Sequence, residues 1–200
     1  MGDDDVAAAL AERSAWIARK LEDSRRANNR ARIGLDRPGV VWLDGRPIDT
    51  ARDGARAVAR LDGEVLRVGG SDAEAARAIE RWYRRFAREA IQRVASEESQ
   101  RLGIEFRSVT IRDQRTRWGS CSPAGNLGFN WRLVVAPEAV LRYVVVHELC
   151  HRRVANHSKR FWRLLEEAAP GWRSPAAWLR EHGGELRAYR VDAPSRPSVP

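Results

Sequence analysis

The chain has 200 residues and a formal net charge of +9. That length suits one domain of ordinary size, and no apolar run approaches the roughly 20 residues that a membrane span requires. The acidic start Asp3-Asp4-Asp5 is unlike a signal peptide, and two cysteines are too few for a disulfide scaffold. We therefore expect a cytoplasmic protein with no membrane partner.

The positive charge is spread along the chain rather than gathered in one run. Lys20 and Lys159 are the only lysines, so nearly all basic residues are arginines, and they are mixed with acids. A dispersed excess of this kind is typical of solvated helix faces. A nucleic-acid partner is therefore an alternative that the sequence does not favour. Nothing in the sequence indicates an oligomeric state.

The chain divides into three parts. An amphipathic helix is predicted from Val6 to Arg32, so residues 1–37 are interpreted as an N-terminal helix and linker. Residues 38–190 are predicted to form the main domain. Residues 191–200 are rich in Pro and Ser and are predicted to be disordered.

Two hairpins and a long helix are expected at the start of the main domain. Asp-Gly pairs separate residues 40–43 from 46–48, and residues 57–61 from 65–68. Asp-Gly between apolar runs favours a tight turn. Ser71 and Glu74 are spaced as a capping box, so a helix with one apolar face should run from there to about Leu102.

Two further strands are predicted before the next helix. Alternating apolar residues indicate strands at 104–112 and 126–135, with a loop or strand end at 115–122. Pro137 and an acid after it open a helix. Because residues 139–154 are mostly apolar on every side, this helix should be buried.

Two shorter helices should complete the domain. Ser158 is placed to cap the first of them. The second should begin at Ser174-Pro175 and stop at Gly183-Gly184.

The buried helix carries the motif His147-Glu148-Leu149-Cys150-His151, an H-E-x-x-H. Histidines at i and i+4 lie one turn apart on one helix face, so both can bind one metal ion, with Glu148 beside them as a general base. A catalytic zinc ion usually takes three protein ligands and leaves a position for water. The motif therefore lacks one ligand.

His157 is the strongest candidate for the third ligand. It lies six residues beyond His151, so the helix must end between them, and Asn156 suits a left-handed helix end. Glu166 or Glu167 would give an alternative His2Glu site.

Cys121, His182 and the spacing of the three histidines also bear on the ligand set. Cys121, in a predicted turn, is a weaker candidate ligand, and His182 is interpreted as a cation at a helix C-terminus. The spacing H-E-x-x-H-x5-H equals that of the metzincins. Val154 replaces their glycine, however, and Met1 is the only methionine for their methionine turn, so this class is excluded.

Several short motifs closely resemble the YgjP-like metallopeptidase family, which is related to the SprT-like and WLM zinc peptidases. They cover about Val40 to Tyr189 and are densest from Arg117 to Trp162. The motifs are Arg117-Trp118-Gly119-Ser120-Cys121-Ser122, Gly125-Asn126-Leu127, Asn130-Trp131-Arg132-Leu133, Ala136-Pro137, Tyr143 to His151, Asn156-His157-Ser158 and Phe161-Trp162.

The resemblance implies a fold and a metal centre. The expected fold is α+β and minigluzincin-like, with a small antiparallel sheet packed on the buried H-E-x-x-H helix. The resemblance implies one Zn²⁺ per chain, bound by His147, His151 and His157, with Glu148 as the base. The chain departs from the family at its N-terminus, where a helix replaces the additional strands usual in the family.

These observations predict a zinc-dependent hydrolase, and specifically a metallopeptidase acting on a peptide or protein. Arg117, Asn130 and Tyr143 are the candidates for substrate or oxyanion contacts. Two alternatives remain. The arginine excess suits a metal-dependent phosphohydrolase of nucleoside triphosphates, and the SprT-like relatives suggest a nucleic-acid-associated protease or binding module.

Overall fold

The computed structural model describes residues 39–191. The predicted N-terminal helix at 6–32 and the tail from 192 onward lie outside the described residues. None of the helices within 39–191 is long and apolar enough to cross a membrane.

The first sheet contains both predicted hairpins. Its strands are β1 (Val40–Leu43), β2 (Arg46–Arg52), β3 (Ala59–Asp62) and β4 (Val65–Val68). They lie in the order β1-β2-β4-β3, and β2 pairs with β4 in parallel. The sheet is therefore mixed, and the expected antiparallel arrangement is wrong for this pair. The second strands of the two hairpins run in the same direction, so placing them side by side makes them parallel.

The second sheet lies beside the H-E-x-x-H helix. It consists of β5 (Ser108–Arg112), β6 (Gly119–Cys121) and β7 (Asn126–Asn130) in the order β5-β7-β6. β6 and β7 form an antiparallel pair, whereas β5 and β7 are parallel. β6 is thus an edge strand, and its position decides the shape of the candidate site.

The strand predicted at 126–135 ends earlier than expected. After Asn130 the chain turns into the 3-10 helix η1 (Trp131–Val134). The Asn130 side chain accepts a hydrogen bond from the Arg132 N–H at 3.0 Å, which satisfies a free donor at the start of the helix. This cap competes with continued strand pairing and ends the strand.

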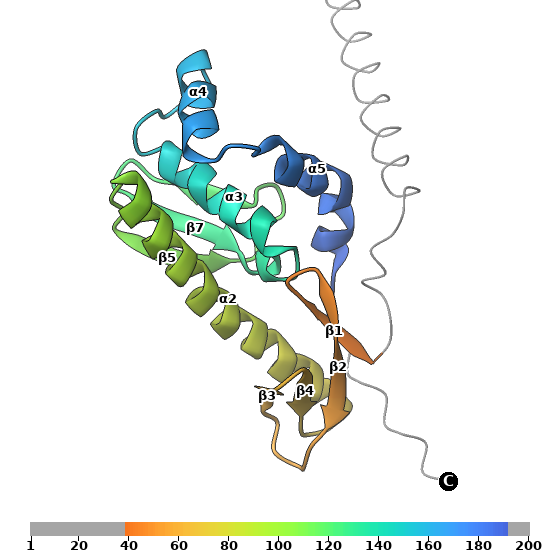
Figure 1. Ribbon diagram of the computed structural model, residues 1–200. Helices are drawn as coiled ribbons and strands as arrows, with labels where there is room; N and C mark the ends of the chain where they lie inside the picture. The colour runs from red at the N-terminus through yellow and green to blue at the C-terminus, as the bar shows by residue number, and fades with distance from the viewer. Residues whose placement is uncertain (1–38, 192–200) are drawn as a thin grey trace, which may run out of the picture.

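The long helix α2 (Asp72–Leu102) is confirmed at both ends. The Ser71 N–H donates to Glu74 at 2.9 Å, as the capping box requires. Gly103 adopts the left-handed conformation with φ 59° and ends the helix. Figure 1 shows α2 running the length of the molecule, with the first sheet at its N-terminal end and the second sheet towards its C-terminal end. It therefore joins the two sheets.

Three helices follow the second sheet: α3 (Glu138–Cys150), α4 (Lys159–Ala168) and α5 (Arg173–Ala188). The expected burial of α3 is confirmed, because most of its side chains are buried. It packs against α2, α4, α5 and β6 (Figure 1). The α+β class is thereby confirmed, with the H-E-x-x-H helix at its centre.

The last helix is longer than predicted. α5 continues through Gly183-Gly184 to Ala188. A Cβ at Gly183 would lie 3.5 Å from Trp118, so the small residue lets α5 approach that ring. Leu186 and Tyr189 are buried beyond the glycines. Burial of these side chains outweighs the weak helix propensity of the two glycines.

Candidate metal centre

The helix α3 places two histidine side chains on one face. His147 and His151 are one turn apart, and their ring centroids are 5.0 Å apart. Phe161 of α4 packs against both rings, at 4.9 Å and 4.5 Å. Phe161 is fully buried, so this contact limits how the two imidazoles can rotate.

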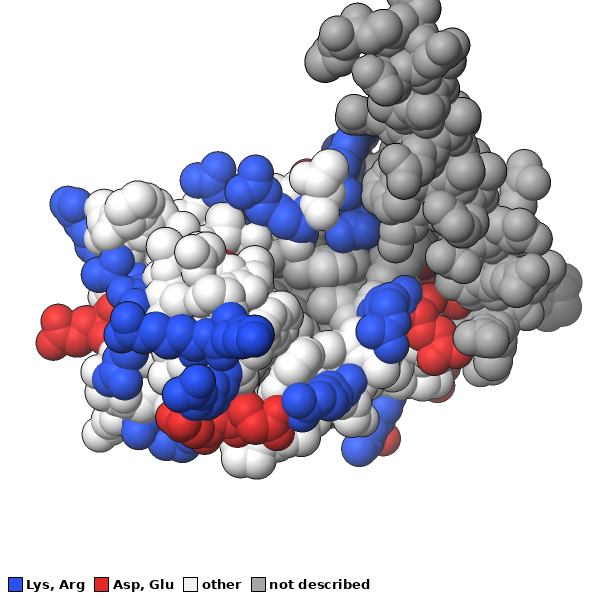
Figure 2. Space-filling model, turned by 90° about the horizontal axis from the view of Figure 1, so that it is seen from above, with Lys and Arg blue, Asp and Glu red and all other residues white. Residues whose placement is uncertain are grey.

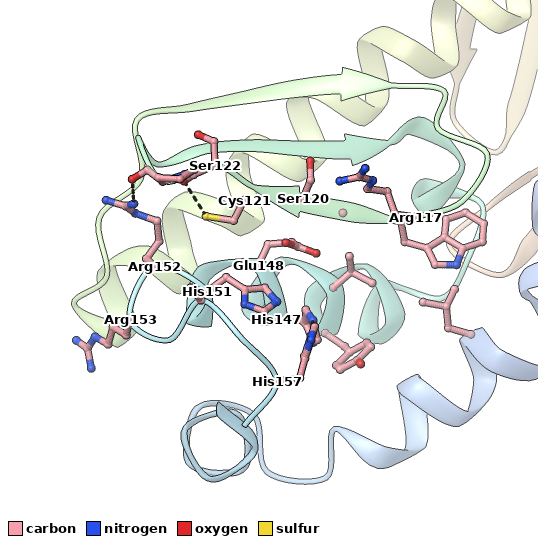
Figure 3. Close-up of a pocket in the computed structure, with 17 residues that line it drawn as sticks. Arg117, Ser120, Cys121, Ser122, His147, Glu148, His151, Arg152, Arg153 and His157 are labelled. Carbon is pink, nitrogen blue, oxygen red and sulfur yellow. Dashed lines mark hydrogen bonds between the residues drawn. The ribbon is translucent and has the colours of Figure 1, made fainter. Parts of the chain in front are cut away.

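The chain returns His157 to the same place. The helix ends at Cys150, and His151 caps it in a right-handed conformation. The His157 ring centroid lies 4.6 Å from that of His151 and 5.0 Å from that of His147. Figure 3 shows the three imidazoles facing one another. The predicted third candidate thus joins the pair.

The turn itself differs from the prediction. Asp44 is the only non-glycine residue with a positive φ among residues 39–191, so Asn156 is not left-handed. Asn156 instead accepts a hydrogen bond from the Ser158 N–H at 3.3 Å through its side-chain oxygen. The helix has already ended at Cys150, so Asn156 shapes the start of α4 rather than the end of α3.

The nitrogens of these rings are arranged as a metal-binding set. One ligand atom from each histidine lies within 4.8 Å of the others. His151 Nδ1 is 3.1 Å from the Val154 carbonyl oxygen, so this nitrogen carries the proton and leaves Nε2 as the free lone pair. His147 Nε2 and His157 Nε2 are 2.9 Å apart. Three imidazole nitrogens that converge in this way fit a metal ion such as zinc.

The alternative ligands do not belong to this set of nitrogens. Glu166 accepts a hydrogen bond from Trp172 Nε1 at 2.9 Å and also pairs with Arg173. Neither Glu167 nor Cys121 belongs to the metal-binding group found within residues 39–191. His182 lies inside α5 rather than at its C-terminus, and its Nδ1 is 3.8 Å from Glu185. Its predicted position is wrong because the helix continues past the two glycines.

Burial sets the protonation of the site. Glu148 is 7% exposed, and this burial raises the pKa of its carboxyl to about 7, although the charge of Arg117 opposes the shift. Burial also lowers the pKa of His147 to about 3, with smaller contributions from His151 and His157. His147 is therefore neutral at pH 7, as a metal ligand must be.

A cavity of about 680 Å³ lies beside the histidines. Arg117 and Tyr143, two of the three candidates for substrate contacts, line it. Asn130 does not line it, because its buried side chain donates to the Gln114 carbonyl oxygen at 2.8 Å and caps η1. Asn130 therefore has a structural role, and the structure does not place it on the cavity wall.

Sequence reasoning missed part of the cavity wall. Trp118 comes from the chain just before β6, and Leu179 comes from α5. Trp118 lies in a motif that already carried the family resemblance. No local sequence pattern marks Leu179 as a site residue, because only the packing of α5 on α3 brings it to the cavity.

The family comparison agrees with this geometry. The model of the YgjP-like metallopeptidase domain matches residues 1–182. The chain belongs to this family. Membership supports a metal-dependent peptidase, a hydrolase that acts on peptides or proteins. The family also implies a divalent metal ion, for which the three histidines are suitable ligands.

A solved structure is also similar to the chain. The crystal structure of the metallopeptidase zymogen of abylysin from Pyrococcus abyssi is 24% identical in sequence, with a TM-score of 0.37. The match covers 49% of this chain and 90% of abylysin. No similar protein was found among curated proteins.

Proposed function

We propose that the protein is a zinc peptidase in which His147, His151 and His157 bind one zinc ion per chain. The convergence of the three imidazoles beside Glu148 carries this proposal. Zinc favours nitrogen ligands and a four-coordinate site, and three protein ligands leave one position for water. When bound, zinc supplies a Lewis acid that polarises a carbonyl group and makes water a nucleophile at neutral pH.

Glu148 is the proposed general base. Its buried carboxyl has a pKa of about 7, so it exchanges a proton readily near neutral pH. It takes a proton from the attacking water and returns it to the amine that leaves when the peptide bond breaks. The carboxylate lies on α3, next to His147 in the chain, so one rigid helix positions both the base and two metal ligands.

Tyr143 and Arg117 are proposed to stabilise the negative charge that develops on the carbonyl oxygen. Both line the cavity. Burial raises the pKa of the Tyr143 phenol, so it keeps its proton and can donate a hydrogen bond at neutral pH. Arg117 contributes a positive charge. Donors of this kind typically contribute about 100-fold or more to the rate.

The test combines metal content with turnover. The parent should contain one zinc per chain and cleave an unstructured peptide, whereas Glu148→Gln should keep the zinc and lose activity by about 1,000-fold or more. Full turnover by Glu148→Gln would reject the assigned base. Hydrolysis of nucleoside triphosphates without cleavage of any peptide would reject the peptidase in favour of a phosphohydrolase.

A further inference from the structure

A groove leads away from the metal centre along α5. It forms a cavity of about 310 Å³. It shares Trp118, Tyr143 and Leu179 with the cavity that contains the histidines, so the two cavities are neighbours. Its lining residues are Trp118, Tyr143, Ala176, Leu179, Arg180, Gly183, Gly184 and Arg187.

The part of the groove nearest to the metal centre is apolar. Trp118, Tyr143 and Leu179 are each partly buried and pack against the core. The two glycines of α5 add no side chains to the wall. A peptide lying here would therefore place an apolar side chain on these rings, where burial away from water is favourable.

The ionisable groups around the groove are strongly unbalanced in charge. Arg180 and Arg187 are the ionisable side chains of the groove apart from Tyr143, and no carboxylate lines it. The neighbouring cavity is lined by one acidic residue, Glu148, and by three arginines. Figure 2 shows more Lys and Arg than Asp and Glu on the face seen from above. An approaching anion is attracted to such a surface.

Two of the three arginines in the metal cavity are already engaged. Arg152 donates to the carbonyl oxygens of Glu105 and Pro123 at 3.2 Å and 2.7 Å. Arg153 donates to those of Leu102 and Gly103, both at 3.1 Å. Figure 3 shows Arg153 pointing away from the three histidines. These two arginines stabilise the fold, and neither is assigned to a ligand.

Arg187 is the cation that points most clearly to a ligand. Its guanidinium carbon lies 4.7 Å above the Trp118 ring, and one Nη donates to the Thr116 carbonyl oxygen at 3.3 Å. Its Nε is buried and has no hydrogen-bond partner within residues 39–191. Burial lowers the pKa of Arg187, and no carboxylate offsets this shift. A partly desolvated cation without a counter-charge is unfavourable, and a bound carboxylate would offset that cost.

We propose that the groove selects acidic peptides: an apolar side chain lies on Trp118 and Leu179, and a nearby Asp or Glu pairs with Arg187 and Arg180. This inference rests on the proposed peptidase function and names its substrate class. Arg180 is exposed, and no hydrogen bond or ion pair engages it within the described part of the chain. A peptide is favoured over a nucleic acid because the apolar residues Trp118 and Leu179 line both the groove and the proposed metal-centre cavity of a peptidase, whereas the two arginines line only the groove.

The first test measures binding without turnover. Zinc-loaded Glu148→Gln is titrated with labelled peptides that differ only by Glu or Gln, placed on either side of one Leu-containing segment. The acidic peptide should bind about tenfold more tightly at low salt, which corresponds to about one well-formed ion pair. Equal affinities would overturn the inference. So would tighter binding of a single-stranded DNA oligonucleotide of the same charge, which would assign the groove to nucleic acid.

Variants identify the arginines. Arg180→Gln together with Arg187→Gln should remove the preference for the acidic peptide over the neutral one. Arg180→Gln alone changes only an exposed side chain, so it should fold normally and reduce the preference for the acidic peptide. It serves as the test if the double variant folds poorly. Arg85→Gln is the matched control, because Arg85 is exposed on α2 and borders neither cavity. An undiminished preference in Arg180→Gln and in the double variant would refute the assignment.

Turnover separates this inference from the proposed function. The parent should cleave the acidic peptide with a kcat/KM about tenfold above that for the neutral one. Cleavage of both peptides at equal rates would refute the selectivity and keep the peptidase. Failure to cleave any peptide would reject the peptidase, whereas the binding preference would still report on the groove.

Discussion

A Cβ atom on Gly119 would lie 2.5 Å from Oε1 of Glu148. Gly119 begins β6, the edge strand of the second sheet, and Glu148 lies on α3. The strand can approach the helix this closely only because Gly119 has no side chain. The backbone of β6 therefore forms the wall against which the proposed base rests.

Replacing Gly119 by Ala should displace the Glu148 carboxylate. A methyl group at this distance must push the carboxylate aside, and a shift of about 1 Å near the chemistry typically costs about 100-fold in rate. The three atoms nearest to the new methyl group all belong to Glu148, so zinc content should stay at one per chain. Peptide-cleavage rates and metal analysis on the same preparation check this prediction. Unchanged kcat in Gly119→Ala would show that the carboxylate position is not critical.

Removing His157 should weaken zinc binding far more than removing His182. His157 Nε2 lies 2.9 Å from His147 Nε2, whereas His182 contacts Trp178 within α5. Loss of an outer-shell partner alone costs about 10–100-fold in metal affinity, so loss of a ligand should exceed about 100-fold. Competition with a chromophoric chelator measures both variants. Equal zinc affinities for His157→Ala and His182→Ala would reject His157 as a ligand.

Replacing Glu98 by Ala should destabilise the contact between α2 and α3. The Glu98 side chain is 5% exposed and accepts hydrogen bonds from Arg142 of α3 at 2.6 Å and from Arg101 at 2.7 Å. Loss of the charge-assisted hydrogen bonds at this buried carboxylate should cost about 2 kcal/mol of unfolding free energy. Glu97→Ala is the neighbouring control. Its side chain is 42% exposed, so its loss should cost under about 1 kcal/mol. Urea denaturation compares the two, and similar losses would contradict the assigned burial effect.

The ion pair of Asp113 with Arg132 should make the free energy of unfolding depend on pH in the acidic range. Burial alone would raise the pKa of Asp113, but the hydrogen bond and charge of Arg132 outweigh it and hold the pKa below its ordinary value. A lowered folded-state pKa stabilises the fold above the unfolded-state pKa of about 3.9, and this stabilisation is lost as pH falls through the folded-state value.

Because the Asp113 side chain is 43% exposed, solvent screens the pair, and Asp113→Asn should reduce the unfolding free energy by about 1 kcal/mol at pH 7. The difference from the parent should shrink as the pH falls below about 4. Urea denaturation at several pH values measures it. A difference that stays constant down to pH 2.5 would mean that the ion pair is not its source. Asp53→Asn, which removes an exposed pair with Arg60, should change stability by under about 1 kcal/mol at every pH.

Sequence patterns predicted helix ends correctly where residues within a few positions of one another decide them. Ser71, Glu74 and Gly103 set the ends of α2, because capping groups and a left-handed glycine act within a few residues. Signals failed where distant contacts outweighed local preference. Gly183 did not end α5, because the helix packs on Trp118 and buries Leu186. The strand after residue 126 ended early at the Asn130 cap, which shows that an alternating pattern alone does not set where a strand ends.

The sequence by itself determined the chemistry of the candidate site, because an H-E-x-x-H on a helix places two imidazoles and a carboxylate within one turn. The tertiary structure decided the surroundings of those groups. It brought His157 to the pair, placed Gly119 against Glu148 and set Arg187 above Trp118. The first two contacts join α3 to a loop and to an edge strand, and the third joins α5 to the segment before that strand. Their geometry depends on how whole elements pack, which no local spacing encodes.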